Sequence, residues 1–98
     1  EVPDGRRVEA LEELLRQAPR KLTRAEIREQ WPGEDRPDPA TLYRWLRRAV
    51  SGGLLRQDGQ GHHHQPFRYW LPESEGRWRQ DPIALLYMPE LLLPPEPR

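Results

Sequence analysis

The stretch Asp38-Pro39-Ala40-Thr41-Leu42-Tyr43-Arg44-Trp45-Leu46-Arg47-Arg48-Ala49-Val50-Ser51-Gly52-Gly53 carries signals for both ends of a helix. The Asp38 carboxylate can accept hydrogen bonds from the free N–H groups of a first turn, and Pro39 suits that turn because its missing donor costs nothing there. The pair Gly52-Gly53 favours a stop at the other end. These signals predict a helix over residues 39–52.

The residues of this predicted helix divide into two faces when they are spaced at about 100° each. The apolar face comprises Leu42, Trp45, Leu46, Ala49 and Val50. The opposite face comprises Ala40, Tyr43, Arg44, Arg47 and Ser51, with Thr41 and Arg48 at its edge. We therefore expect one face, Trp45 included, to lie in the core. The other face offers three arginines and a tyrosine to a partner.

Two further helices are predicted before this one. Residues 7–17 carry an apolar stripe at helical spacing, and Pro19 ends it. Thr23 and Glu26 have the spacing of a capping box, in which each side chain bonds the other's backbone N–H. The second helix should run from there to about Trp31. Residues 20–22 are short and suit an extended piece, and residues 32–37 form a polar connection.

After residue 53 the apolar period changes from 3.6 to 2, which is typical of strands. Residues 54–58 and 66–72 form two strand-like runs around the Gly-containing loop 59–65, so we expect a β-hairpin with a long tip. Alternation along the second run points Phe67, Tyr69 and Leu71 to one side, and Arg68 and Trp70 to the other. We expect the C-terminal segment to cover Trp70.

The C-terminal residues 72–98 contain a short apolar stretch among many prolines. We expect a linker over residues 72–76, a helix of about two turns over 83–88 and a Pro-rich tail, because proline forbids a long helix. The apolar side chains either fold back onto the domain or bind a partner through Ile83, Leu86 and Leu92. That partner would be a second copy or the rest of a parent protein.

Charge is distributed unevenly along a chain whose formal net charge is 0. Residues 39–71 contain five arginines and a single carboxylate, Asp58, whereas acidic residues are in excess on both sides. A local cationic region favours an anionic partner. The chain has no cysteine, which excludes disulfides and thiolate metal sites, and no apolar run long enough to span a bilayer. We expect a cytoplasmic protein.

The order helix, extended piece, helix, helix, hairpin resembles the winged helix-turn-helix superfamily. The resemblance covers Arg7 to Leu71 and rests on the Thr23 and Asp38 caps and on Gly52-Gly53-Leu54-Leu55-Arg56, which leads into the hairpin. It implies a mainly α fold with a small β-hairpin: a three-helix core plus wing over residues 1–71. The connection 32–37 is longer than the turn of a compact helix-turn-helix.

The resemblance also implies a DNA-binding role, in which the third helix enters the major groove and the wing touches the backbone. The groove-facing residues would be Thr41, Tyr43, Arg44, Arg47 and Arg48. The wing residues would be Gln60, His62, His63, His64 and Arg68. Arg24, near the start of the second helix, would contact the DNA backbone.

No catalytic, cofactor or metal signature is recognised in the chain. His62, His63 and His64 are consecutive, so their side chains point in different directions, and a structural zinc site needs about four converging ligands. Because histidine gains positive charge in mildly acidic solution, we expect the wing to bind DNA more tightly there. No nucleophile–base pair or phosphate-binding loop is present. We therefore expect a protein that is not an enzyme and holds no cofactor or metal.

These observations favour a non-catalytic winged-helix module that binds double-stranded DNA through helix 39–52 and wing 59–65. We expect it to be the C-terminal part of a larger protein of replication, of a mobile element or of transcription. The alternative is a winged helix used for protein–protein assembly or dimerisation without direct DNA contact. The neutral net charge and the apolar C-terminal segment suit that alternative.

Overall fold

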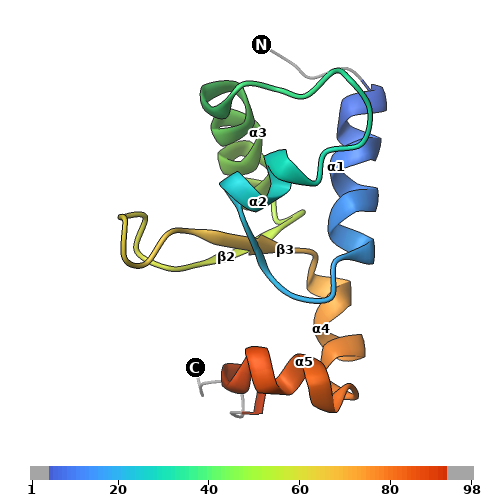
Figure 1. The fold of residues 1–98 in the computed structure, drawn as a ribbon, viewed down its shortest axis with the longest axis vertical. Coiled ribbons are helices and arrows are strands. Elements are labelled where there is room, and N and C mark those ends of the chain that lie inside the picture. Colours follow the sequence, from blue (N-terminus) through green and yellow to red (C-terminus); the bar gives the residue numbers. More distant parts are fainter. Residues whose placement is uncertain (1–4, 93–98) are drawn as a thin grey trace.

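The computed structural model describes residues 5–92 of the 98-residue chain and shows a mainly helical protein with a small antiparallel sheet (Figure 1). In chain order the elements are α1 (Gly5–Gln17), β1 (Leu22–Thr23), α2 (Arg24–Glu29), α3 (Pro39–Ser51), β2 (Arg56–Asp58), β3 (Arg68–Trp70), α4 (Pro72–Arg79), α5 (Pro82–Tyr87) and the 3₁₀ helix η1 (Pro89–Leu92). In Figure 1, α1, α2 and α3 lie on one side of the sheet and α4 and α5 lie on the other. The Pro-rich tail, 93–98, lies outside the described residues.

The capping box predicted before α2 is confirmed. The Thr23 N–H donates to Glu26 Oε1 at 2.9 Å, and the Glu26 N–H donates to Thr23 Oγ1 at 3.2 Å. Two backbone donors at the start of the helix are thereby satisfied. The helix itself ends at Glu29, earlier than predicted, although Trp31 is still buried in the core.

The sheet has the order β1–β3–β2, with both pairs antiparallel, so the predicted hairpin gains a third strand from the segment before α2. The central residue Tyr69 is paired with Leu22 on one side and Gln57 on the other. Its neighbours in the chain point to the opposite face. The predicted alternation is therefore confirmed: Tyr69 packs among the helices and Trp70 packs against the C-terminal segment.

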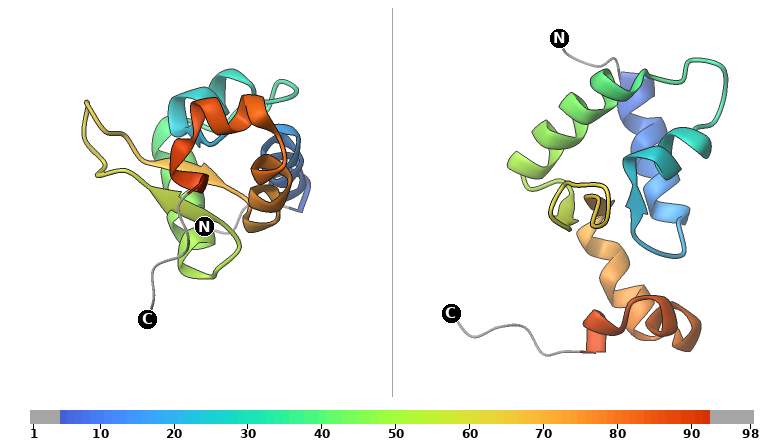
Figure 2. Two further views of the ribbon diagram at one scale, coloured as in Figure 1. Left: turned by 90° about the horizontal axis from the view of Figure 1, so that it is seen from below. Right: turned by 60° about the vertical axis from the view of Figure 1, so that its left-hand side comes forward.

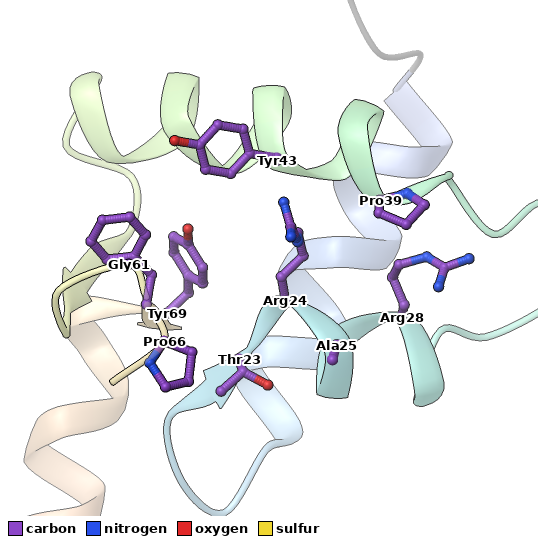
Figure 3. Close-up of a pocket in the computed structure, with 10 residues that line it drawn as sticks. Thr23, Arg24, Ala25, Arg28, Pro39, Tyr43, Gly61, Pro66 and Tyr69 are labelled. Atoms are coloured by element: carbon purple, nitrogen blue, oxygen red, sulfur yellow. The ribbon is translucent and has the colours of Figure 1, made fainter. Parts of the chain in front are cut away.

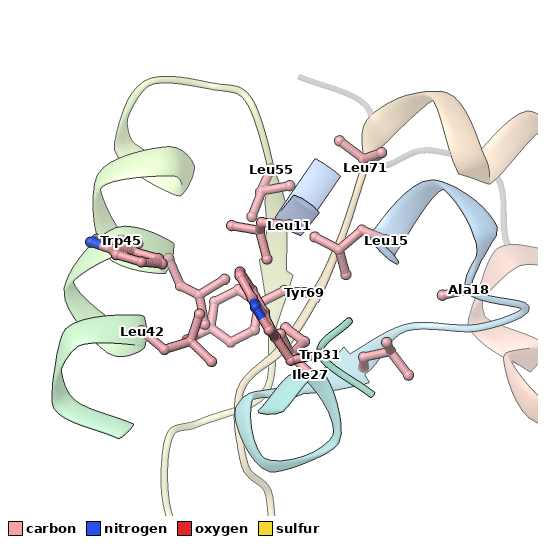
Figure 4. Packing of buried hydrophobic residues seen from close by; sticks show 12 residues of the cluster. Leu11, Leu15, Ala18, Ile27, Trp31, Leu42, Trp45, Leu55, Tyr69 and Leu71 are labelled. Atoms are coloured by element: carbon pink, nitrogen blue, oxygen red, sulfur yellow. The ribbon is translucent and has the colours of Figure 1, made fainter. Parts of the chain in front are cut away.

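The main core lies between the sheet and the first three helices (Figure 4). It comprises Leu11, Leu15, Ala18, Leu22, Ile27, Trp31, Leu42, Trp45, Leu46, Leu55, Tyr69 and Leu71. The rings of Trp31 and Trp45 meet at a centroid distance of 6.3 Å, a separation at which aromatic pairs attract. The prediction that Trp45 is a core residue is confirmed.

The linker expected over residues 72–76 is wrong, because α4 begins at Pro72. Proline is acceptable at that first helical position, and the helix buries Trp78 against Trp70 in a second, smaller core. Apolar spacing within α4 is weak, so only this tertiary contact distinguishes it from a polar linker. Helix α5 and η1 complete the small core with Ala84, Met88 and Leu91, and Figure 2 shows them beneath the sheet.

Two polar attachments join the C-terminal segment to the rest of the protein. The Arg77 guanidinium donates to Arg16 O at 2.7 Å and to Ala18 O at 2.9 Å, and so satisfies carbonyl groups at the end of α1. The second attachment is an ion-pair network that we call the lysine cluster, formed by Lys21, Asp58, Arg68 and Glu90. Residues 72–92 are therefore held to the sheet by charge as well as by apolar contact.

Candidate nucleic-acid interface

Helix α3 begins at the predicted cap. The Asp38 carboxylate accepts a hydrogen bond of 2.7 Å from the Thr41 N–H, and Pro39 occupies the first turn. This backbone hydrogen bond, with the Thr41 side chain and the Arg44 charge adding to it, lowers the pKa of Asp38 below its ordinary value. The carboxylate is therefore charged at neutral pH, as a helix N-terminus favours. The helix ends at Ser51 with Gly52 as its C-cap.

The two faces predicted for α3 are present. Leu42, Trp45 and Leu46 are buried, whereas the side chains of Arg44, Arg47 and Arg48 are exposed. Thr41 and Tyr43 are half-buried beside them, and Arg44 Nη2 donates to Thr41 Oγ1 at 3.3 Å. The five residues that the resemblance assigned to the DNA groove thus share one side of one helix.

Tyr43 is the contact between this face and helix α2. The guanidinium carbon of Arg24 lies 5.3 Å from the centroid of the Tyr43 ring, and that of Arg47 lies 5.8 Å from it. Cations at these distances are attracted to the electron-rich face of an aromatic ring. Arg24, from α2, is therefore brought next to the cationic face of α3. Because this is a tertiary contact, helical periodicity could not reveal it.

A groove of about 590 Å³ lies below Tyr43, between α2, α3 and the base of the hairpin (Figure 3). The residues that line it are Thr23, Arg24, Ala25, Arg28, Pro39, Tyr43, Gly61, Pro66, Phe67 and Tyr69. None of these described residues carries a carboxylate. Phe67 and Tyr69 contact the main core and also line this groove. Their shared side of the strand was readable from alternation, but the groove beside them was not.

The β2–β3 loop extends away from α1 and beyond the helices (Figure 1). Its ends are tied by backbone bonds from Gln60 N–H and Gly61 N–H to Gln65 O, of 2.9 and 3.0 Å. Gln60, His62, His63 and His64 are all exposed on it. His62 Nε2 lies 3.0 Å from Gln60 Oε1, and the rings of His63 and His64 meet edge to face.

Arg68 projects from the face of the sheet that carries the lysine cluster, where it lines a pocket with Gln60, His64 and Glu90. Its Nε and Nη2 donate to the two carboxylate oxygens of Asp58 at 2.8 and 2.7 Å. Such bidentate pairs are strong and directional. The hydrogen bonds with Asp58 raise the pKa of Arg68 above its ordinary value, against the effect of burial. The structure therefore places Arg68 beside Gln60 and His64 of the loop, but on the opposite face of the sheet from Tyr69.

Among residues 5–92, no three His, Asp or Glu side chains come close enough together to hold a metal ion. No helix in this part of the chain has both the length and the apolar character needed to cross a membrane.

No protein-family model, curated protein or solved structure matches this chain.

Proposed function

We propose that this chain is a winged-helix module that binds double-stranded DNA through α3 and the β2–β3 loop. The element order supports the proposal: three helices, a short strand before the second of them, and an antiparallel hairpin after the third. The exposed face of α3 supplies arginines, which bind phosphates and read guanine edges in the major groove.

One observation carries the proposal, namely the position of Asp58. It is the only carboxylate between residues 39 and 71, and it lies on the face of the sheet opposite the groove. There it accepts hydrogen bonds from Lys21 and Arg68, so its charge is balanced locally. Asp58 therefore does not neutralise the arginines of α3, and a cationic helix face suits an anionic partner.

These residues would contact different parts of the DNA. Arg44, Arg47 and Arg48 would enter the major groove, where one bidentate arginine–guanine pair contributes about 1–3 kcal/mol of discrimination. Arg24, beside Tyr43, would bind a backbone phosphate. The loop would reach the flanking backbone with Gln60 and His62–His64. Arg68 would hold the base of the loop through Asp58 rather than touch DNA.

The test is a titration of a labelled duplex by fluorescence anisotropy at two salt concentrations. The wild-type protein should lose affinity with a slope of about −0.9 in log K against log salt for each phosphate contacted. Replacing Arg44, Arg47 and Arg48 with alanine should abolish most binding. A control that removes Arg16, Arg20 and Arg79 instead has the same net charge and should bind like the wild type.

Equal binding by both triple variants would refute a role for the α3 face. Absence of binding by the wild-type protein would refute the proposal as a whole.

A further measurement concerns the loop: affinity for DNA at fixed salt should rise between mildly alkaline and mildly acidic buffer, because histidines gain charge. Replacing His62, His63 and His64 with glutamine should remove that rise.

A second candidate function, protein–protein assembly, is favoured by the outer surface of α5. Ile83, Leu86 and Tyr87 are 66%, 81% and 63% exposed, and Leu92 of η1 is also exposed. A contiguous group of exposed apolar side chains is typical of an interaction surface. This surface lies on the far side of the sheet from α3, so assembly and DNA binding are compatible (Figure 1).

A further inference from the structure

The groove between α2, α3 and the hairpin has the properties of a small-molecule site. Its volume, about 590 Å³, lies within the range of about 300–1,000 Å³ typical of ligand pockets. Its walls are mostly apolar or aromatic, with contributions from Ala25, Pro39, Pro66 and Phe67. Such sites add a few polar groups that fix the orientation of the ligand. Two of these polar groups decide which ligand fits.

The first is the Tyr69 hydroxyl. The residue as a whole is only 1% exposed, but it lines the groove, and its hydroxyl makes no hydrogen bond to any described residue. Figure 3 shows the hydroxyl directed across the groove toward Tyr43. A hydroxyl that reaches the groove without a protein partner is available to bond a ligand there.

The Tyr69 hydroxyl also remains a hydrogen-bond donor at neutral pH. Burial raises the pKa of Tyr69, the neighbouring Tyr43 raises it further, and Arg24 opposes both effects. The net pKa lies above the ordinary value of 10.0, so the proton stays on the oxygen. A protonated phenol in an apolar wall favours an acceptor, and a charged acceptor binds it most strongly.

The second polar group is the Arg24 guanidinium, which lines the same groove and rests over the Tyr43 ring. Arg28 is fixed nearby, because its Nε donates to Pro37 O at 3.0 Å. Since the described lining contains no carboxylate, the positive charge of Arg24 is not balanced from within the groove. A planar guanidinium matches a carboxylate in geometry and can bind it through two parallel hydrogen bonds.

We propose that this groove binds a small aromatic carboxylate. The carboxylate accepts hydrogen bonds from Arg24 and from the Tyr69 hydroxyl, and the aromatic ring lies against Phe67, Pro66 and Tyr43. The apolar walls favour this occupant over a bare phosphate, which would lose its hydration there without apolar contact in return. Arg24 is shared with the proposed DNA-binding surface, but the ligand is tested in the absence of DNA, so failure of one proposal leaves the other standing.

The proposal is tested with sodium 2-naphthoate as the probe, followed by amide chemical shifts and by calorimetry. We expect saturable binding, with shift changes at Thr23, Arg24, Tyr43 and Phe67. The neutral analogue 2-naphthamide should bind at least about tenfold more weakly, because it lacks the charge that Arg24 recognises. Inorganic phosphate should not compete.

Two variants test the roles of the Tyr69 hydroxyl and the Arg24 guanidinium. Tyr69→Phe keeps the ring and should weaken 2-naphthoate at least about tenfold, the effect of losing one hydrogen bond to a charged group. Arg24→Ala should abolish the preference for the acid over the amide. Tyr87→Phe and Arg79→Ala, which lie outside the groove, are the matched controls and should bind like the wild type.

The outcomes are decisive because Tyr69→Phe removes only an unbonded hydroxyl, so its free energy of unfolding should not fall. A folded Tyr69→Phe protein with unchanged affinity overturns the proposal. So does 2-naphthoate binding whose shift changes lie elsewhere, or no binding at all. Competition by phosphate at equal concentration would also overturn it and would identify the groove as a phosphate site.

Discussion

Lys21 Nζ lies 2.7 Å from Glu90 Oε2, across 69 positions of the chain. The same nitrogen lies 2.9 Å from Asp58 Oδ2 and 4.1 Å from the centroid of the Trp70 ring. Lys21 is the only lysine in the sequence, and its side chain is 4% exposed. One buried cation therefore joins the segment before β1, the end of β2 and the 3₁₀ helix η1.

Replacing Lys21 with methionine should lower the free energy of unfolding by about 2–3 kcal/mol, measured by urea denaturation at pH 7. The change removes one of the two cations that Asp58 and Glu90 share and leaves them only Arg68. The loss is smaller than for a fully buried pair because the Asp58 and Glu90 side chains are 30% and 37% exposed. The control is Arg20→Met at the neighbouring, exposed position, which should cost less than about 1 kcal/mol. Equal effects of the two changes would contradict the prediction.

The lysine cluster should also make stability depend on pH in the acid range. Burial raises the pKa values of Asp58 and Glu90, but hydrogen bonds and charges from Lys21 and Arg68 outweigh it, so both pKa values lie below their ordinary 3.8 and 4.5. Lowered carboxylate pKa values contribute stability that is complete above the ordinary values and lost as the pH falls through the lower folded values.

The free energy of unfolding should therefore decline as the pH falls below about 4.5, and continue to decline below 3.8. Urea denaturation in steps from pH 6 to pH 2.5 measures this. The double variant Asp58→Asn, Glu90→Gln should start from a lower stability and show a shallower decline. If the free energy of unfolding of the double variant falls with pH as steeply as that of the wild type, other carboxylates cause the loss of stability in acid.

Two glycines should respond to alanine in opposite directions. Gly59, at the start of the β2–β3 loop, has φ +94°, and an added Cβ would collide with the Pro66 carbonyl oxygen. Gly59→Ala should lower the free energy of unfolding by more than about 1 kcal/mol. Gly76 lies within α4, and an added Cβ there would meet no atom within 4 Å.

Gly76→Ala should therefore raise the free energy of unfolding by about 0.5–1 kcal/mol, because alanine loses less backbone entropy in a helix. Thermal and urea denaturation of both variants provide the comparison. A destabilised Gly76→Ala protein would argue against the helix that starts at Pro72.

The outer surface of α5 should mediate association rather than folding. Leu86, at 81% exposed, makes little contact within the chain, so Leu86→Lys should change the free energy of unfolding by no more than about 0.5 kcal/mol. The same change should suppress concentration-dependent self-association, measured by light scattering or sedimentation. Met88→Lys is the contrasting variant, because Met88 is buried in the small core and its loss should unfold the C-terminal segment. If the wild-type protein stays monomeric at high concentration, self-association does not explain the exposed apolar side chains of α5.

Much of the local structure could be predicted because its causes lie within a few residues of each other. The Asp38 cap, the Thr23–Glu26 capping box and the buried side of α3 all depend on spacings of three or four residues. The alternation that separates Tyr69 from Trp70 depends on a spacing of one. Of the candidate interface, the cationic side of α3 was equally readable. The contact between this side of α3 and Arg24, through Tyr43, could not be predicted from the sequence.

The sequence by itself determined where α2 and α3 begin, which residues of the second hairpin strand share a side, and that residues 39–71 are cationic. The tertiary structure alone decided that Lys21 and Arg68 pair with Asp58 and Glu90, and that the Tyr69 hydroxyl faces a groove beside Arg24. The physical reason is the distance along the chain between the residues that interact. Caps and periodicity are set by neighbouring residues, whereas buried charges and unbonded hydroxyls find their surroundings only when distant segments pack together.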